Sequence, residues 1–295
     1  MSTKTTHYYV PAQSIWPIVA AVALFILALG AGNFIQQGNP ATGNTGSFGG
    51  PLFALGLLSM IAVIFFWFGT TVKESLAGMN SRQMDVSYRM SMMWFIFSEV
   101  MFFAAFFGTL FYARWLSVPW LAGEGKGVMT HEVLWPDFQN IWPLVATPAG
   151  KTLEAMGPFP LPLINTLILI TSGLFLTTAH HALKANNRQK LIINLLITVV
   201  LGFTFMGVQA YEYHHAYAEM GLTLNAGIYG STFFMLTGFH GLHVTIGAIM
   251  LTVMLIRSIK GHFTPNEHFA FEAAAWYWHF VDVVWIFLFF VVYWL

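Results

Sequence analysis

The sequence predicts an all-α integral membrane protein with seven transmembrane helices. Of its 295 residues, 57% are hydrophobic and only 8% are charged, whereas soluble domains carry about 25% charged residues. The mean hydropathy is +0.67. Apolar segments of about 20 residues, the length that crosses a bilayer as a helix, follow one another along the chain. We therefore expect residues 1–295 to form a single polytopic membrane domain.

Seven segments meet this length criterion. Turn-forming residues at 36–51, QQGNPATGNTGSFGGP, separate the first two segments, because such a stretch does not remain in hydrocarbon. A long loop at 116–158 follows the third segment, and its apolar pieces are too short to span. An interfacial hairpin and a partner-binding surface remain open for this loop. The predicted helices cover about 15–35, 51–72, 90–115, 159–183, 191–213, 230–256 and 269–294.

The positive charges predict the orientation. If the sides of the membrane alternate, the side of the N-terminus holds nine of the twelve basic residues, namely Lys4, Lys73, Arg82, Arg89, Lys184, Arg188, Lys190, Arg257 and Lys260. The other side holds Arg114, Lys126 and Lys151. Because cytoplasmic loops carry the excess of Lys and Arg, we expect a cytoplasmic N-terminus and an external C-terminus. The first fifteen residues contain one lysine and no cleavage signature, which predicts no removable signal peptide.

Composition excludes several classes of function. The chain has 12 basic and 12 acidic residues, so its charge gives no reason to expect a nucleic-acid partner. It has no cysteine, which excludes disulfides, thiolate metal sites and covalent haem attachment through a CxxCH motif. Neither an HExxH motif nor a phosphate-binding P-loop occurs.

Glu99 is the most informative ionisable residue, because it lies in the apolar stretch WFIFSEVMFFAAFFG at 94–108 with no cation near it in sequence. Nine residues into its predicted helix corresponds to a depth of about 14 Å. Charged side chains at such depth are costly, so we expect a neutral acid that forms hydrogen bonds. A proton-linked or partner-contacting role and a packing role remain open.

Other polar residues in the spans predict a structural network rather than a metal or catalytic site. His240 and His243 share one helix face, but two imidazoles are fewer than the three or four ligands of a usual metal site. His180 and His181 are consecutive and face different directions. We therefore predict no metal site and no catalytic residue in this chain. The predicted network consists of His240, His243, Glu212, Glu272, His279 and Asp282.

Six long motifs resemble subunit 3 of the aa3-type cytochrome c oxidases of bacteria and mitochondria, in order and over nearly the whole chain. They are FIFSEVMFF at 95–103, LPLINT at 161–166, AHHAL at 179–183, QAYEY at 209–213, YGSTFFMLTGFHGLHVTIG at 229–247 and FEAAAWYWHFVDVVW at 271–285.

The resemblance implies a fold and a set of roles. The fold is a two-helix and a five-helix bundle separated by a lipid-filled, V-shaped cleft. The chain would be an accessory subunit of a proton-pumping oxidase in a bacterial cytoplasmic membrane, with its C-terminus in the periplasm. It would pack on subunit 1, contact subunit 2 and small accessory subunits, bind phospholipid, support proton uptake and protect against turnover inactivation. Haem a, haem a3 and copper would lie in partner subunits, and cytochrome c would donate electrons to the complex.

The resemblance also assigns residues. Glu99 matches the intramembrane acid of the family that reacts with carbodiimide. Residues on the cytoplasmic side, where the family has lipid headgroups and subunit contacts, are Lys73, Glu74, Arg89, Arg257 and Lys260. The stretch SLAGMNSRQMD at 75–85 lacks the paired histidines of the mitochondrial pattern, so part of a headgroup site is in doubt.

Two alternatives come from other kinds of protein. Subunit 3 of a haem-copper quinol oxidase shares the HGLHV pattern but is typically shorter, with five helices. A proton-coupled transporter would use Glu99, His240 and His279 as a relay, but it should show broken helices and inverted repeats, which this sequence does not indicate.

Overall fold

The computed structural model describes residues 13–37, 48–147 and 152–295. Within these ranges the chain forms helices and no strand, and seven helices are long and apolar enough to cross a membrane. The predicted all-α fold with seven spans is therefore confirmed. Lys4 and Lys151, which entered the charge count, lie outside the described residues, as do most of the first loop and of the segment considered for a signal peptide.

The chain divides into two compact units, residues 1–88 and 89–295. The first contains α1 (Trp16–Gln37), α2 (Gly49–Leu76) and the start of α3 (Arg82–Tyr112). The second contains the rest of α3, α4 (Val118–Leu121), α5 (Val128–Leu134), α6 (Leu161–Lys184), α7 (Arg188–Ala218), α8 (Ile228–Lys260) and α9 (Phe269–Leu288), and the chain ends in a π-helical turn, Phe289–Trp294. The lipid-filled cleft between two bundles stays a prediction.

Several helices extend beyond their predicted ends. α3 begins at Arg82 rather than near residue 90, and α8 continues to Lys260 rather than ending near residue 256. The added turns carry charged residues. A prediction that counts only apolar residues leaves them out of the helix, although charged residues readily continue a helix at the membrane edge. The long loop, for which an interfacial hairpin and a partner-binding surface remain open, contains α4, α5 and a bridge between Ala146 and Thr152.

Small residues bring α1 and α2 close together in the first unit. The buried residues recur every seven positions and are Ala23 and Gly30 in α1 and Gly49, Gly56 and Val63 in α2. A Cβ atom added at Gly56 would collide with backbone atoms of Leu27, and one at Gly30 would collide with those of Phe53. Because lipid is as apolar as these side chains, close backbone approach and packing must hold the pair together.

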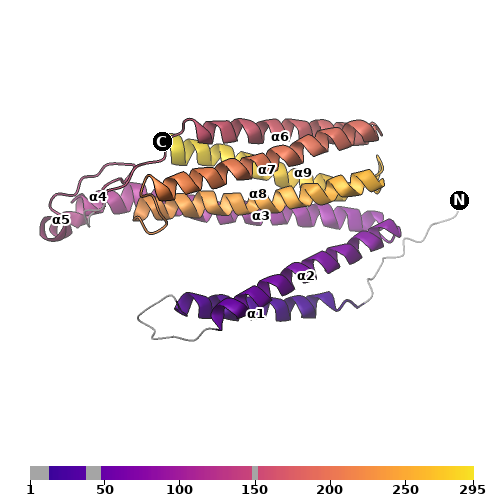
Figure 1. Ribbon diagram of the computed structural model, residues 1–295, viewed down its shortest axis with the longest axis horizontal. Coiled ribbons are helices and arrows are strands. Elements are labelled where there is room, and N and C mark those ends of the chain that lie inside the picture. The colour runs from indigo at the N-terminus through magenta and orange to yellow at the C-terminus, as the bar shows by residue number, and fades with distance from the viewer. Residues whose placement is uncertain (1–12, 38–47, 148–151) are drawn as a thin grey trace. The chain divides into compact units, whose positions relative to one another are not determined.

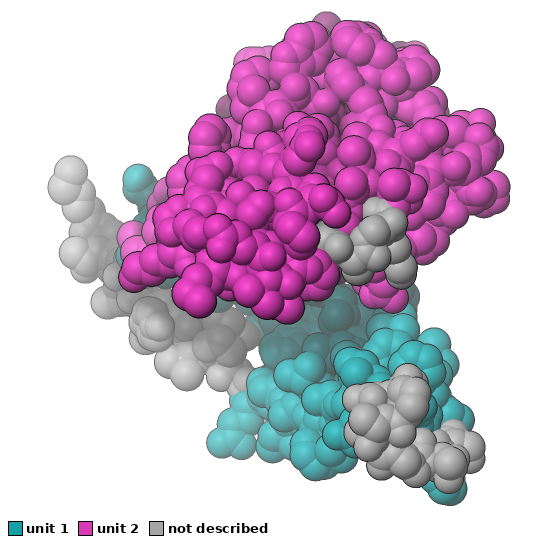
Figure 2. All heavy atoms as spheres, turned by 90° about the vertical axis from the view of Figure 1, so that its left-hand side faces the viewer, with its two compact units in different colours: residues 1–88 teal, residues 89–295 magenta. Residues whose placement is uncertain are grey.

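In the second unit, α6, α7, α8 and α9 run alongside one another (Figure 1), with α6 packed on α7 and α9, and α8 packed on α7 and α9. The side chains of this unit form one closely packed body (Figure 2). α3 joins it through aromatic rings: the centroid of Phe103 lies 4.9 Å from that of His243, and the centroid of Phe107 lies 4.7 Å from that of Phe287. These contacts position Glu99 of α3 against α8.

Trp278 of α9 is the side chain that connects the four helices. Its indole N–H donates a hydrogen bond of 2.9 Å to Ser172 Oγ in α6. A Cβ atom added at Gly202 in α7 would lie 2.7 Å from the indole, and one at Gly247 in α8 would lie 2.8 Å from it. Both glycines therefore leave the space that the fully buried Trp278 ring fills.

The α1–α2 packing predicts the effect of one substitution. Gly56→Val should destabilise the helix pair by about 1–3 kcal/mol or more, because the new side chain must displace backbone rather than a flexible side chain. The measurement is the loss of the α-helical circular dichroism signal as the purified protein is heated in detergent. Gly69→Val on the same helix is the matched control, because a Cβ atom there meets nothing within 4 Å. Equal losses for both variants would contradict this account.

Candidate functional site

Glu99 of α3 pairs with His243 of α8. Its Oε2 lies 2.8 Å from His243 Nε2, and the side chains are 21% and 10% exposed, respectively. His243 Nδ1 lies 2.6 Å from the backbone oxygen of Phe239. A carbonyl oxygen only accepts, so Nδ1 donates and Nε2 faces the carboxyl group. One proton then lies between Nε2 and Oε2, and it belongs either to a carboxylic acid or to an imidazolium.

Aromatic rings pack against the imidazole of this pair. The ring of His243 stacks with that of Tyr277 at 6.3 Å and meets the ring of Phe103 edge-on at 4.9 Å. Apolar surroundings of this kind strengthen a hydrogen bond between the two groups. The pair can hold and exchange a proton, and among the described residues its hydrogen bonds do not continue to a third side chain.

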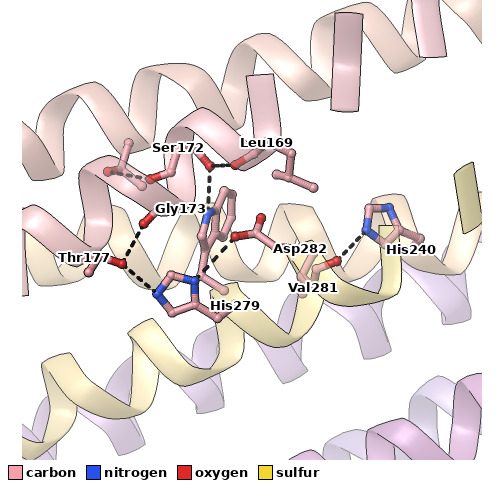
Figure 3. A network of polar contacts seen from close by, with 10 residues as sticks. Leu169, Ser172, Gly173, Thr177, His240, His279, Val281 and Asp282 are labelled. Atoms are coloured by element: carbon pink, nitrogen blue, oxygen red, sulfur yellow. Dashed lines mark hydrogen bonds and ion pairs between the residues drawn. The ribbon is translucent and has the colours of Figure 1, made fainter. Parts of the chain in front are cut away.

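A second polar network joins α6 to α9 (Figure 3). His279 Nδ1 lies 3.5 Å from Asp282 Oδ2, and Thr177 Oγ1 lies 3.4 Å from His279 Nε2. Gly173 makes room for these groups, because a Cβ atom there would collide with Asp282 Oδ2. Alongside them, Trp278 donates to Ser172, as described above. The interface between α6 and α9 is therefore lined by closely packed hydrogen-bonding groups.

His240 lies deeper in the unit and is fully buried. Its Nε2 is 3.2 Å from the backbone oxygen of Val281 in α9, and Figure 3 shows the two pointing toward one another. His240 and His243, which the sequence places on one face, therefore bond to different helices. This separation does not favour joint ligation of one ion, because each Nε2 atom already faces a different oxygen.

Glu212 and Glu272 have partners far along the chain. Glu212 Oε1 accepts a hydrogen bond of 2.7 Å from the Tyr293 hydroxyl, which connects α7 to the last turn of the chain. Glu272 Oε2 forms an ion pair with Arg89 of α3. The structure thus brings His279 together with Asp282 but not with Glu272, although Glu272 and His279 share a helix face. A shared helix face does not by itself indicate that two residues pair. Here Arg89 of the neighbouring helix α3 forms the ion pair with Glu272.

The remaining candidates for lipid or subunit contact differ in their surroundings. Lys73 and Glu74 lie in the last turns of α2, where Lys73 is exposed. Lys260 is exposed at the end of α8, whereas Arg257 is 8% exposed and its guanidinium lies over the ring of Phe263, 4.6 Å from the centroid. Arg257 therefore mainly packs against Phe263, whereas the side chain of Lys260 is exposed.

Arg188 is a basic residue whose role the sequence did not indicate. Its guanidinium donates to the backbone oxygens of Ser258, at 3.1 Å, and of Ile259, so it caps the C-terminal end of α8. Just beyond this end, burial, together with the positive charges of Arg257 and Lys260, lowers the pKa of His262. Helix-terminus signals in the sequence identify where α8 ends but not which side chain satisfies its carbonyl groups.

The fold and these contacts define a polytopic helical membrane protein in which Glu99, Glu212 and Glu272 pair with residues of other helical segments. Comparison with protein families gives a match to the model described as cytochrome c oxidase subunit III, over residues 6–126 and 128–295. The chain belongs to this family. It is therefore a subunit of an oxidoreductase complex that contains other subunits.

Individual relatives agree. A cytochrome c oxidase subunit 3 from Struthio camelus is 39% identical over 100% of this chain and 99% of its own length. One from Prototheca wickerhamii is 40% identical over 94% of this chain and 93% of its own length. One from Gallus gallus is 43% identical over 81% of this chain and 82% of its own length.

The contact between Glu99 and His243 predicts non-additive stability effects. Glu99→Ala and His243→Ala should each lower the temperature at which the purified complex loses this subunit. The double variant should lose little more than the worse single variant, because hydrogen bonds between transmembrane helices contribute about 0.6 kcal/mol on average and each single change already removes the pair. Glu99→Ala combined with His240→Ala is the control and should be additive. Additive losses for the contacting pair would contradict the contact.

Proposed function

We propose that this chain is a non-redox accessory core subunit of an aa3-type cytochrome c oxidase in a bacterial cytoplasmic membrane. In this proposal it packs mainly on subunit 1 and also contacts subunit 2 and small accessory subunits. The partner subunits carry haem a, haem a3 and copper, and cytochrome c supplies the electrons. The N-terminus lies in the cytoplasm and the C-terminus in the periplasm, as the distribution of Lys and Arg indicates.

One observation carries the non-redox assignment. The HxxH pair of α8 is the pattern that most resembles a haem or metal site in the sequence, yet each Nε2 atom faces an oxygen of the subunit itself. For His240 this is the Val281 carbonyl oxygen, and for His243 it is the Glu99 carboxyl. Ligation of iron would require breaking both contacts in an apolar interior, where an unpaired polar group costs several kcal/mol.

The proposed support of proton uptake rests on Glu99. It is an ionisable group at membrane depth that is partly exposed, and its imidazole partner lies within hydrogen-bond distance. Such residues are commonly functional as well as structural, because their insertion is costly. The subunit would act on proton delivery through its contact with the catalytic subunit, not by reducing oxygen itself.

The proposed phospholipid binding rests on two surfaces. Large apolar side chains of α3 are exposed, among them Trp94, Phe95 and Phe97, which suits contact with acyl chains. Basic side chains at helix ends, Lys73 in α2 and Lys260 in α8, are exposed and suit phosphate headgroups. Phospholipids bound at these surfaces would help to hold the subunit on its partner.

Removal of the subunit from the purified complex tests the protective role. The haem absorption spectrum should stay unchanged, while the number of turnovers before the enzyme inactivates should fall. The measurement is oxygen consumption with reduced cytochrome c, followed until it stops, before and after adding back the intact subunit. An unchanged number of turnovers would remove the protective role, and turnover with quinol in place of cytochrome c would favour the quinol oxidase alternative.

Glu99→Gln tests the proton role separately. The complex should assemble, and its rate should change far less than the roughly 100-fold or greater loss that follows removal of a catalytic acid or base. Ser98→Ala is the matched control, because Ser98 is adjacent and its hydroxyl bonds only within its own helix, to Phe95 O at 2.6 Å. Complete loss of oxygen reduction by an assembled Glu99→Gln complex would contradict an accessory role.

A further inference from the structure

Two imidazoles and a carboxylate converge where α6 ends and α9 begins. His180 lies in the last turns of α6, His268 is the residue before α9, and Glu272 lies one turn into α9. The Nε2 atom of each histidine is 3.5 Å from Glu272 Oε1. One potential ligand atom from each of the three residues lies within 4.8 Å of the other two. The three atoms therefore surround a common point.

The hydrogen bond of His268 Nδ1 is the one that a metal-binding histidine usually makes. Its Nδ1 lies 3.1 Å from the backbone oxygen of Thr264. Because a carbonyl oxygen only accepts, Nδ1 is the donor, and the neutral ring presents the lone pair of Nε2 to the cluster. Metal-binding histidines commonly donate their other ring N–H to a carbonyl or carboxylate in this way, which fixes the tautomer and the ring orientation.

The converging nitrogen atoms are otherwise unsatisfied. The Nε2 atoms of His180 and His268 are both buried and have no hydrogen-bond partner among the described residues. Their distance of 3.5 Å from Glu272 Oε1 is longer than the 2.7–3.2 Å of a normal N–H···O hydrogen bond. The Nε2 lone pair of His268 and a carboxylate oxygen that face one another repel unless a proton or a metal cation lies between them.

Glu272 is held in position by its other oxygen. Oε2 forms an ion pair with Arg89, whose guanidinium lies 5.1 Å from the centroid of the Phe269 ring. This contact leaves Oε1 directed at the two imidazoles. A ligand carboxylate that is itself bonded on its second oxygen is the usual arrangement around a protein metal ion.

The spacing suits zinc. Ligand atoms at about 2.0–2.2 Å from a tetrahedral Zn²⁺ lie about 3.3–3.6 Å from one another. The two nitrogen-to-oxygen distances, each 3.5 Å, fall in this range, and the three ligand atoms lie within 4.8 Å of one another. Two imidazoles and one carboxylate form a ligand set that Zn²⁺ accepts, with a fourth position left for water or for a group from a partner.

We propose that His180, His268 and Glu272 form a binding site for a divalent transition-metal ion, with Zn²⁺ as the best match. The ion would connect the end of α6 to the start of α9 and would satisfy three side chains at once. The side chain of His180 is 23% exposed, which leaves a path for the ion. The site does not depend on the roles proposed in the preceding subsection.

The test uses the purified oxidase complex that contains this subunit. The complex is first dialysed against a chelator and then equilibrated with radioactive Zn²⁺, and bound zinc is counted per haem. We expect the unaltered complex to bind one zinc equivalent more than the His268→Ala and Glu272→Gln complexes. X-ray absorption at the zinc edge, taken as the difference between unaltered and variant complexes, should show two imidazole nitrogens and a carboxylate oxygen.

The matched control is His181→Ala, which removes a neighbouring exposed histidine outside the cluster. This variant should keep the additional zinc equivalent. Subunit content and the haem spectrum establish that each variant is assembled, and Glu272→Gln retains the size of the side chain if His268→Ala fails to assemble. The proposal is overturned if the unaltered complex binds no more zinc than the cluster variants, or if His181→Ala loses the same equivalent. The first result would leave an ion pair between Arg89 and Glu272 with the two imidazoles beside it.

Discussion

The burial of Trp278 is the interaction on which the second unit most depends. In a membrane, apolar side chains gain little by leaving lipid for protein, so helices associate through close packing and through hydrogen bonds that lipid cannot supply. Trp278 provides both: its ring fills the space left by Gly202 and Gly247, and its N–H bonds to Ser172. One side chain of α9 therefore fixes the positions of α6, α7 and α8.

The polar residues follow from the same constraint. Once the helices are fixed, ionisable side chains inside the unit need partners within the protein, because hydrocarbon supplies none. Glu99 meets His243, Glu212 meets Tyr293, and Glu272 meets Arg89. In the proposed function these pairs hold a redox-silent subunit in shape beside its catalytic partner. At a further cluster, the Nε2 atoms of His180 and His268 face the carboxylate of Glu272. These two atoms have no hydrogen-bond partner among the described residues.

The sequence predicts the spans well because their signal is local. A run of about 20 apolar residues is enough to indicate a helix that crosses the bilayer, and the structure contains seven such helices in the described residues. The partner of Glu99 was not predictable, because His243 lies 144 positions away and only helix packing brings the two together. His268 was missed although its spacing of four from Glu272 was visible, because the third group, His180, comes from another helix.

The most direct test of the central claim compares two tryptophans of α9. Trp278→Phe removes the donor to Ser172 and leaves part of the space between the glycines empty, whereas Trp276→Phe alters a residue that is not fully buried. The measurement is the midpoint temperature at which the purified complex loses the subunit. We expect a clear fall for Trp278→Phe, corresponding to a loss of about 1–3 kcal/mol, and a much smaller fall for Trp276→Phe. Equal midpoints for the two variants would contradict this expectation.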